Sequence, residues 1–445
     1  SGYPSDHFVL DGALKEGSKL GVTLGSGHDG LITEGWKTKM PDVTADQLTD
    51  HFISDASGMK FDLNSAGEVT LTAIPHKHLL CGTACSHGGE QHTKILTWTA
   101  VSSLSEITKA GHYYLTQDIE TTDIWVPANG VVLCLNGHSI INTNHGYTIM
   151  VRKDYTFTLC DCKGDSAEYG RITHAEQADG TKYSGRGVYA IGTFNMYGGS
   201  ISGNVSPDSS GVLLDNGANS GGKGTAFNMY GGEISENVLN GVTLTNSSNA
   251  NFNMYGGEIS RNTDYGVEIM VGATFNMSGG VIKDNPSRIQ HIGVWCQGGT
   301  FNMSGGEISS CTRGVHVTCT DDSFRGGAGC LEMSGGTIKE NKIGVSLFTR
   351  YDGKGYSTNN ITKSSKFTMT GGEIINNTKI GVDMGYNKQQ NFHAGGELTV
   401  GGTAKIQDNS NKNANSYGNV YFCYGEIKLT SSPALTEGAY IGITT

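Results

Sequence analysis

One short phrase recurs along most of this chain: Phe-Asn-Met, one further residue and two glycines, or a close variant of it. Its first residue stands at eight positions, namely Phe194, Phe227, Phe252, Phe275, Phe301, Leu331, Phe367 and Leu398. The intervals between them are 33, 25, 23, 26, 30, 36 and 31 residues. A repeat of this length is typical of folds in which each unit buries its apolar face against the next. The chain is therefore expected to form a stack of similar coils.

Each repeat contains three short segments with the residue types of β-strands. They are Phe-Asn-Met, then Glu-Ile-Ser or a variant after the two glycines, then a segment that begins with Gly-Val. Alternating and β-branched residues favour strands, and Gly and Asn between them mark turns. The sequence predicts an all-β fold: a right-handed single-stranded parallel β-helix with three short strands in each coil of about 22–25 residues.

Stacking of the coils would align equivalent side chains in columns about 4.8 Å apart. One inward column would contain the Phe or Leu of each repeat, with Met two residues later. A second would contain Ile201, Ile234, Ile259, Ile282, Ile308, Ile338 and Ile374. A column of asparagines is expected at the following turn, because Asn tolerates left-handed backbone and bonds neighbouring backbone groups. Its members are Asn204, Asn237, Asn262, Asn285, Asn341, Asn377 and Asn409, with Cys311 replacing Asn in one coil.

This pattern, over roughly residues 95–440, resembles the right-handed parallel β-helix (pectin-lyase-like) superfamily. That superfamily includes pectin-cleaving enzymes, glycosidases, phage tailspikes and bacterial adhesins, so the resemblance implies a fold but no single function. The segments Trp-Thr-Ala at 98–100, Gly-His-Tyr-Tyr-Leu at 111–115 and Leu-Cys-Leu-Asn-Gly-His at 133–138 are similar to those leading into the repeats of large surface proteins of Gram-positive bacteria. The resemblance implies a secreted or cell-surface protein.

Charge and composition exclude several partners. The chain has 31 basic and 42 acidic residues, a net charge of −11, which disfavours nucleic acid because phosphate binding needs clustered Lys and Arg. The sequence contains no run of about 18 apolar residues, so it does not predict a segment inserted in a membrane. The chain opens Ser1-Gly2-Tyr3, as expected of a processed or recombinant mature form. We expect a monomer that binds carbohydrate and needs no organic cofactor.

Residues 1–75 lack the repeat, and residues 95–445 form the predicted β-helix. Strand-like segments at 19–24, 59–63 and 68–74 and a short helix at 44–52 indicate a small α/β or β cap domain in residues 1–75. Residues 76–94 form a His- and Cys-rich junction between the two parts.

The junction has the residue types of a structural zinc site. Residues 76–92 contain four histidines and two cysteines: His76, His78, Cys81, Cys85, His87 and His92. Tetrahedral zinc takes thiolate and imidazole ligands, and four of them leave no open position. The expected ligand set is His78, Cys81, Cys85 and His87, and the alternative is a Cys81–Cys85 disulfide. A second disulfide is expected between Cys319 and Cys330, which bracket an insert.

Function is expected on the outer face of the Gly-Val strands, because the interior of a β-helix is filled. Alignment of these strands gives a first outward column, Tyr189, Leu213, Thr243, Glu268, Trp295, His316, Ser346 and Asp383. The second is Ile191, Asp215, Thr245, Met270, Gln297, Thr318, Phe348 and Gly385. The long inserts, residues 216–226, 320–329, 350–366 and 386–396, all follow this strand and would wall a groove. Aromatic, carboxylate and amide groups together are what a sugar requires.

These columns predict a glycoside hydrolase that uses two carboxylates. The candidate acid, base or nucleophile residues are Glu268, Asp215 and Asp322. The candidate substrate-binding residues are Trp295, His316, Gln297, Phe348, Arg350, Tyr351 and Asp383. A non-catalytic adhesin or carbohydrate-binding module on the same face is the first alternative. A polysaccharide lyase is the second, and only the Asp321-Asp322 pair resembles its acidic site.

Overall fold

The computed structural model describes two compact units, Ser1–His76 and Lys77–Thr445. The described residues are 8, 10, 12, 14–23, 30–55, 59–80, 94–163, 166–205, 210–215, 224–245, 249–285, 291–319, 327–349, 364–384, 396–409, 418–422, 425–429 and 433–444.

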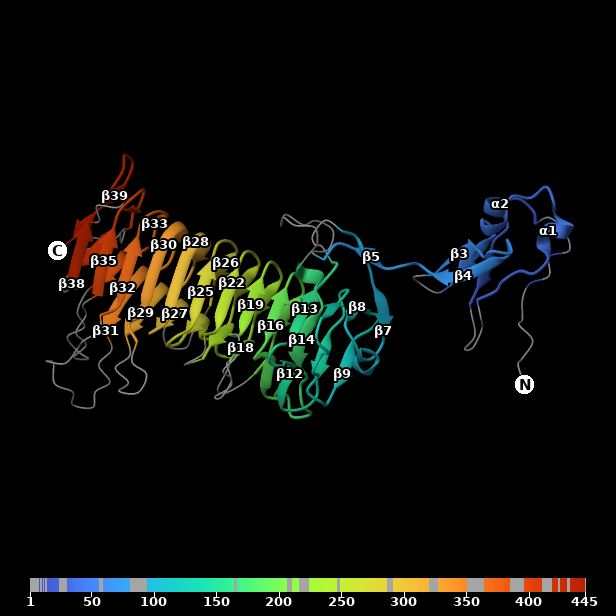
Figure 1. Cartoon of the computed structure of the whole chain (residues 1–445), viewed down its shortest axis with the longest axis horizontal. Coiled ribbons are helices and arrows are strands. Elements are labelled where there is room, and N and C mark those ends of the chain that lie inside the picture. The colour runs from blue at the N-terminus through green and yellow to red at the C-terminus, as the bar shows by residue number, and fades with distance from the viewer. Residues whose placement is uncertain are drawn as a thin grey trace. The chain divides into compact units, whose positions relative to one another are not determined.

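The second unit is a parallel β-helix, as predicted. Its strands stack in a row along the unit (Figure 1), and two parallel sheets of 23 and 11 strands contain them. The first strands of successive coils are β7 (Thr99–Val101), β8 (Gly111–Leu115), β10 (Val131–Cys134), β13 (Thr156–Cys160), β16 (Thr193–Met196), β19 (Ala226–Met229), β22 (Asn251–Met254), β25 (Thr274–Met277), β28 (Thr300–Ser309), β30 (Cys330–Lys339), β32 (Lys366–Met369), β35 (Gly396–Val400) and β38 (Gly425–Leu429).

The second and third strands of the coils repeat in the same way. The second strands are β9 (Ile119–Thr121), β11 (Ile140–Asn142), β14 (Arg171–His174), β17 (Ser200–Ser202), β20 (Glu233–Ser235), β23 (Glu258–Ser260), β26 (Val281–Lys283), β33 (Glu373–Ile375), β36 (Lys405–Gln407) and β39 (Tyr440–Ile441). The third strands, which form the 11-stranded sheet, are β12 (Gly146–Val151), β15 (Gly185–Ala190), β18 (Val212–Leu214), β21 (Val242–Leu244), β24 (Tyr265–Ile269), β27 (Ile292–Gln297), β29 (Arg313–Cys319), β31 (Ile343–Thr349), β34 (Ile380–Met384), β37 (Val420–Phe422) and β40 (Ile443–Thr444).

The coils depart from the prediction in two respects. In β28 and β30 the first and second strands join into one ten-residue strand, with register shifts in their pairing where the two glycines lie. Two short 3-10 helices, η1 (Leu104–Glu106) and η2 (Ser166–Glu168), lie among the first coils.

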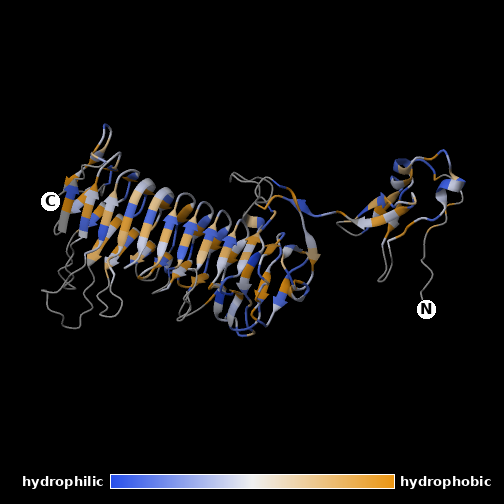
Figure 2. Ribbon diagram, in the orientation of Figure 1, coloured by the Kyte–Doolittle hydropathy of each residue, from blue (hydrophilic) through white to orange (hydrophobic). Residues whose placement is uncertain are grey.

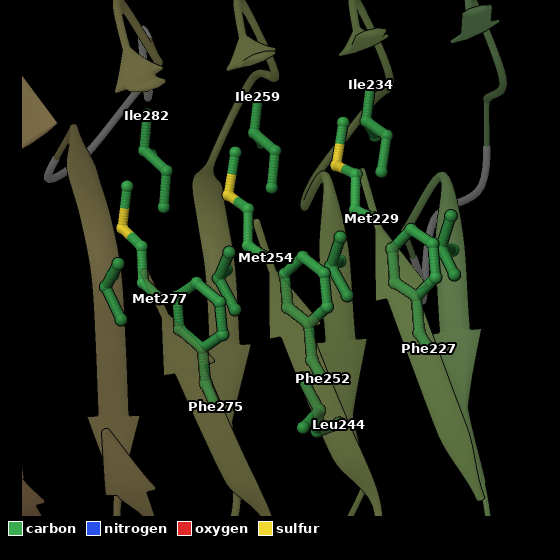
Figure 3. Close-up of a cluster of buried hydrophobic side chains, with 14 of the residues drawn as sticks. Phe227, Met229, Ile234, Leu244, Phe252, Met254, Ile259, Phe275, Met277 and Ile282 are labelled. Carbon is green, nitrogen blue, oxygen red and sulfur yellow. The ribbon is translucent and has the colours of Figure 1, made fainter. Parts of the chain in front are cut away.

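The interior of the β-helix is a set of apolar ladders. Phe227, Phe252 and Phe275 are fully buried, and neighbouring rings stack with centroids 4.7 and 4.6 Å apart. Figure 3 shows the Met and Ile ladders that run beside them, and Figure 2 shows apolar and polar residues alternating along the strands. The predicted inward columns are therefore confirmed. The alternation places every second side chain of a strand on the outer face, where a site can form.

The asparagine column is confirmed, but with a different backbone role. All seven predicted asparagines are buried, and each donates to backbone carbonyls or to the next asparagine; Asn262 Nδ2, for example, contacts Ile234 O at 3.0 Å and Asn285 Oδ1 at 3.1 Å. The left-handed residue is the one before each Asn, such as Arg261 at φ 55°. The side-chain amide of each Asn satisfies buried backbone groups by hydrogen bonds. The residue before the Asn, rather than the Asn itself, has the left-handed backbone conformation of the turn.

Replacing Asn262 by Ala is expected to lower the free energy of unfolding by about 2–3 kcal/mol, because it leaves buried backbone partners unsatisfied. Asn253→Ala is the matched control. It lies in the same coil, and its Nδ2 donates to Asn228 Oδ1 at 2.8 Å in a half-buried ladder on the outer face. Chemical denaturation of both variants measures the difference; equal losses would contradict a special role for the inner ladder.

The first unit contains β1 (Leu20–Val22), α1 (Trp36–Lys39), α2 (Ala45–Thr49), β2 (Phe52–Ser54), β3 (Met59–Leu63) and β4 (Val69–Ala73). Thr44 and Gln47 form a capping box that starts α2. A small core surrounds Trp36, Leu48 and Phe52. β1 pairs with β2, and β3 with β4, in two separate two-stranded sheets. The unit is thus a small α/β domain with its own core.

Candidate functional site

The outer face of the 11-stranded sheet brings four predicted residues into one row. Glu268 in β24 is in register with Trp295 in β27, and Trp295 with His316 in β29. His316 is in register with Ser346, which is in register with Asp383 in β34. Parallel strands lie about 4.8 Å apart, so these side chains follow one another in a continuous row. The first outward column is therefore aligned as the sequence predicts.

Glu268 is the most unusual residue of this row, because its carboxyl is almost buried. Its exposed fraction is 8%, and its Oε2 accepts a hydrogen bond of 2.8 Å from Asn240 Nδ2. Burial raises the pKa of Glu268 to about 7; the Asn240 hydrogen bond opposes this rise, and the negative charge of Asp264 adds to it. Glu268 is thus a carboxylic acid that holds or releases its proton near neutral pH.

Asp215 has partners of its own and lies apart from Glu268. Its Oδ2 accepts a 3.1 Å hydrogen bond from the hydroxyl of Tyr189, and its Oδ1 accepts one of 3.1 Å from Thr245. Burial and the Asp215 charge raise the pKa of Tyr189 to about 12. Asp215 is two strands from Glu268 and two residues further along the strand direction, so strand geometry separates their backbones by about 12 Å.

Aromatic rings continue the row beyond Glu268. Trp295 is half-buried, meets Tyr265 edge to face at 4.8 Å and donates from Nε1 to Thr318 Oγ1 at 3.1 Å. Its ring centroid is 6.3 Å from that of His316, which in turn contacts Phe348 at 5.4 Å. These rings present partly exposed apolar faces, the type of surface that stacks on the CH face of a sugar.

His316 is a neutral hydrogen-bonding group. Burial and the positive charge of Arg313 lower the pKa of His316 to about 3, so its imidazole is uncharged at neutral pH. Its Nδ1 lies 2.7 Å from Ser346 Oγ. Burial also lowers the pKa of Arg313, whereas the charge of Asp383 favours its protonated form. This part of the row therefore combines a neutral imidazole with the positive charge of Arg313 and the negative charge of Asp383.

Gln297 and Phe348 belong to the second outward column. Both are half-buried and flank Thr318, with which each is in register across β29. Asp322, Arg350 and Tyr351 lie outside the described residues.

The alignment of outward columns missed Asn240 and Asp264, which act on Glu268, and Tyr265, whose ring meets Trp295. Asn240 and Asp264 lie in the turn before a third strand, and Tyr265 is the first residue of β24. The signal was available, because Asn240 and Tyr265 each stand directly before the glycine of a Gly-Val pair. A comparison of that position across repeats would have identified an amide and a phenol beside three isoleucines, two arginines and one serine.

Of the four predicted zinc ligands, His78 lies in the described part of the chain. Cys81, Cys85 and His87 lie in residues 81–93, outside the described residues. Cys319 and Cys330 are not joined to each other in the structure, so the predicted disulfide between them is not confirmed. No disulfide forms among the cysteines that the structure describes.

Comparison with models of protein families, with curated proteins and with solved structures found no match. Within the described ranges, no helix has the length and apolar character needed to span a membrane.

Proposed function

We propose that this protein is a secreted or cell-surface glycoside hydrolase that binds a glycan on the outer face of the 11-stranded sheet. The observation that carries the proposal is the position of Glu268, a buried carboxylic acid with a pKa of about 7 beside the half-buried Trp295. A general acid works best when its pKa is near the working pH, and an adjacent aromatic ring holds a sugar against it.

Glu268 would act as the acid that protonates the glycosidic oxygen. As the bond from that oxygen to the anomeric carbon breaks, water or a second carboxylate attacks the carbon from the opposite side. If water attacks, its proton passes to the second carboxylate. Asp264 is our preferred second carboxylate, since its charge acts on Glu268. Asp215 and Asp322 remain the candidates that the sequence predicts.

The first alternative is a glycan-binding module without catalysis. The aromatic row of Tyr265, Trp295, His316 and Phe348 would serve binding equally well. A raised pKa at Glu268 favours the enzyme, because a surface that only binds gains nothing from a buried ionisable acid. A polysaccharide lyase is less well supported, since a β-elimination needs positive charge beside an acidic sugar and a chain of net charge −11 suits a polyanion poorly.

A panel of neutral and host-type glycans tests the proposal when binding and released product are measured on the same samples. We expect the wild-type chain to bind and cleave at least one member. Binding without product would favour the non-catalytic module, and neither binding nor product would contradict both forms of the proposal.

Replacing Trp295 by Ala is expected to weaken binding of that glycan about tenfold, because a buried Trp contact typically contributes more than about 1 kcal/mol. Tyr255→Ala is the control: this tyrosine is 45% exposed and lies outside the row. Isothermal titration calorimetry measures both. A larger effect at Tyr255 than at Trp295 would place the glycan on a different face.

A further inference from the structure

Four potential metal ligands from distant parts of the sequence meet beside the first coils. One ring nitrogen of His76, one of His78 and the sulfurs of Cys134 and Cys162 all lie within 4.8 Å of one another. We propose that these four side chains bind one zinc ion in a closed structural site. The proposal is independent of the glycan site and differs from the ligand set that the sequence predicts, with which it shares only His78.

The β-helix itself brings the two cysteines together. Cys134 is the last residue of β10 and pairs in register with Cys160 of β13; Cys162 follows two residues later. Leu133 points into the core, so alternation along the strand directs Cys134 to the outer face. There it joins a separate apolar cluster with Trp98 and Leu80. One sulfur is thus held at the end of a strand and the other two residues after the neighbouring strand, beside an apolar cluster.

His78 is oriented by its neighbours as a metal ligand would be. It lies in β5 (Lys77–His78), which pairs with β6 (Leu96–Thr97). Its ring stacks on Trp98 with centroids 4.2 Å apart, and its Nδ1 lies 2.6 Å from the carbonyl oxygen of Leu79. A carbonyl can only accept, so Nδ1 carries the proton and Nε2 is the unprotonated nitrogen. Metal-bound histidines commonly donate their second nitrogen to a carbonyl in this way.

The donor set selects zinc among common metals. Two sulfurs and two imidazole nitrogens suit zinc, whereas calcium and magnesium require oxygen ligands. Zinc–sulfur bonds of about 2.3 Å and zinc–nitrogen bonds of about 2.0–2.1 Å place tetrahedral ligand atoms about 3.3–3.8 Å apart. The observed limit of 4.8 Å is compatible with closure around an ion by small side-chain movements. Four protein ligands leave no position for substrate, so the role is structural.

A disulfide between Cys134 and Cys162 is the competing use of these sulfurs. It would leave both histidines without a role, and the structure has Cys134 as a thiol. A zinc site predicts bound metal and two reduced cysteines, whereas a disulfide predicts no metal at this site and no thiol on either cysteine. Counting reactive thiols and bound metal in the same sample distinguishes them.

The test is the zinc content of the purified full-length chain, measured by mass spectrometry after dialysis against zinc and then buffer. We expect at least one zinc per wild-type chain, and Cys134→Ala and Cys162→Ala should each lower the retained zinc at this site more than tenfold. Cys160→Ala is the matched control, since Cys160 is the buried neighbour of Cys134 in register but outside the group of four. Cobalt substitution of the wild type should give the intense visible bands of tetrahedral cobalt with two thiolates.

Far-UV circular dichroism shows whether each variant has folded, and the cobalt spectrum needs no variant at all. Zinc content unchanged in both Cys134→Ala and Cys162→Ala would overturn the proposal. So would a wild-type chain that takes up neither zinc nor cobalt, or loss of all zinc in Cys81→Ala and Cys85→Ala while Cys134→Ala retains it.

Discussion

The Glu268→Gln variant is expected to release sugar product about 10²–10⁴-fold more slowly than the wild type, with glycan affinity changed less than about threefold. Gln preserves the shape of the side chain and can still hydrogen-bond Asn240, but it has no proton to give the leaving oxygen. The loss corresponds to the usual contribution of general acid catalysis. Product formation and binding by the same protein preparation measure the two effects separately.

Glu258→Gln is the matched control for this variant. Glu258 belongs to the same coil, but it lies in β23, where it forms a surface ion pair of 3.0 Å with Lys283. We expect no change in product release for Glu258→Gln. An equal decrease in both variants would assign the effect to folding rather than to the acid.

Glu268→Gln is also expected to change how the stability of the protein depends on pH, and this effect requires no substrate. Burial raises the pKa of Glu268 from 4.5 to about 7, so the folded state holds this proton more tightly than the unfolded state. The stabilisation is fully present below pH 4.5 and is lost as the pH rises through about 7, a change of about 3 kcal/mol at 1.36 kcal/mol per pKa unit. Glu268→Gln should therefore become the more stable protein at alkaline pH. A residue that costs stability at neutral pH is more easily explained by function than by folding.

Replacing Phe252 by Ala is expected to lower the free energy of unfolding by about 3–5 kcal/mol, the usual cost of emptying a buried aromatic position. The ring is fully buried and stacks on Phe227 and Phe275, so its removal also breaks two ring contacts. Each coil contacts only its neighbours, and the cavity would therefore weaken the coupling between the coils on either side. Urea denaturation followed by circular dichroism measures the loss.

Tyr255→Ala provides the comparison for the core variant. Tyr255 lies three residues after Phe252 and stacks on Tyr230 at 4.8 Å, but it is 45% exposed. We expect a loss below about 1 kcal/mol, because an exposed ring gains little from burial. A loss at Tyr255 as large as that at Phe252 would mean that the outer tyrosine ladder, and not the core, holds the coils together.

Repetition made the fold and the row of the site predictable from the sequence. Equivalent positions in successive repeats must align, so the register of Glu268, Trp295 and His316 followed from counting residues within each repeat. The burial of Glu268 did not follow, because it depends on Asn240 and on the turn before β24, where the repeats differ. Local position within a repeat is thus predictable, whereas the environment of a side chain is not.

The metal ligands show a second limit of sequence reasoning. Close spacing along the chain favoured ligands next to His78, yet the structure brings Cys134 and Cys162 to it from the first coils. Cys134 occupies an outward strand position, which resembles an ordinary buried thiol in the sequence. Only the folded chain brings these residues together, because their spacing along the sequence gives no sign of it.

The pH dependence of product release by the wild-type protein is the most direct test of the central claim, that Glu268 is the acid of a glycan-cleaving site. It requires the glycan that the panel identifies, and kcat/KM measured between pH 4 and 9. We predict a decrease in kcat/KM above an apparent pKa near 7, absent from any residual activity of Glu268→Gln. A rate that does not change between pH 5.5 and 8.5, or product release by Glu268→Gln equal to that of the wild type, would contradict the claim.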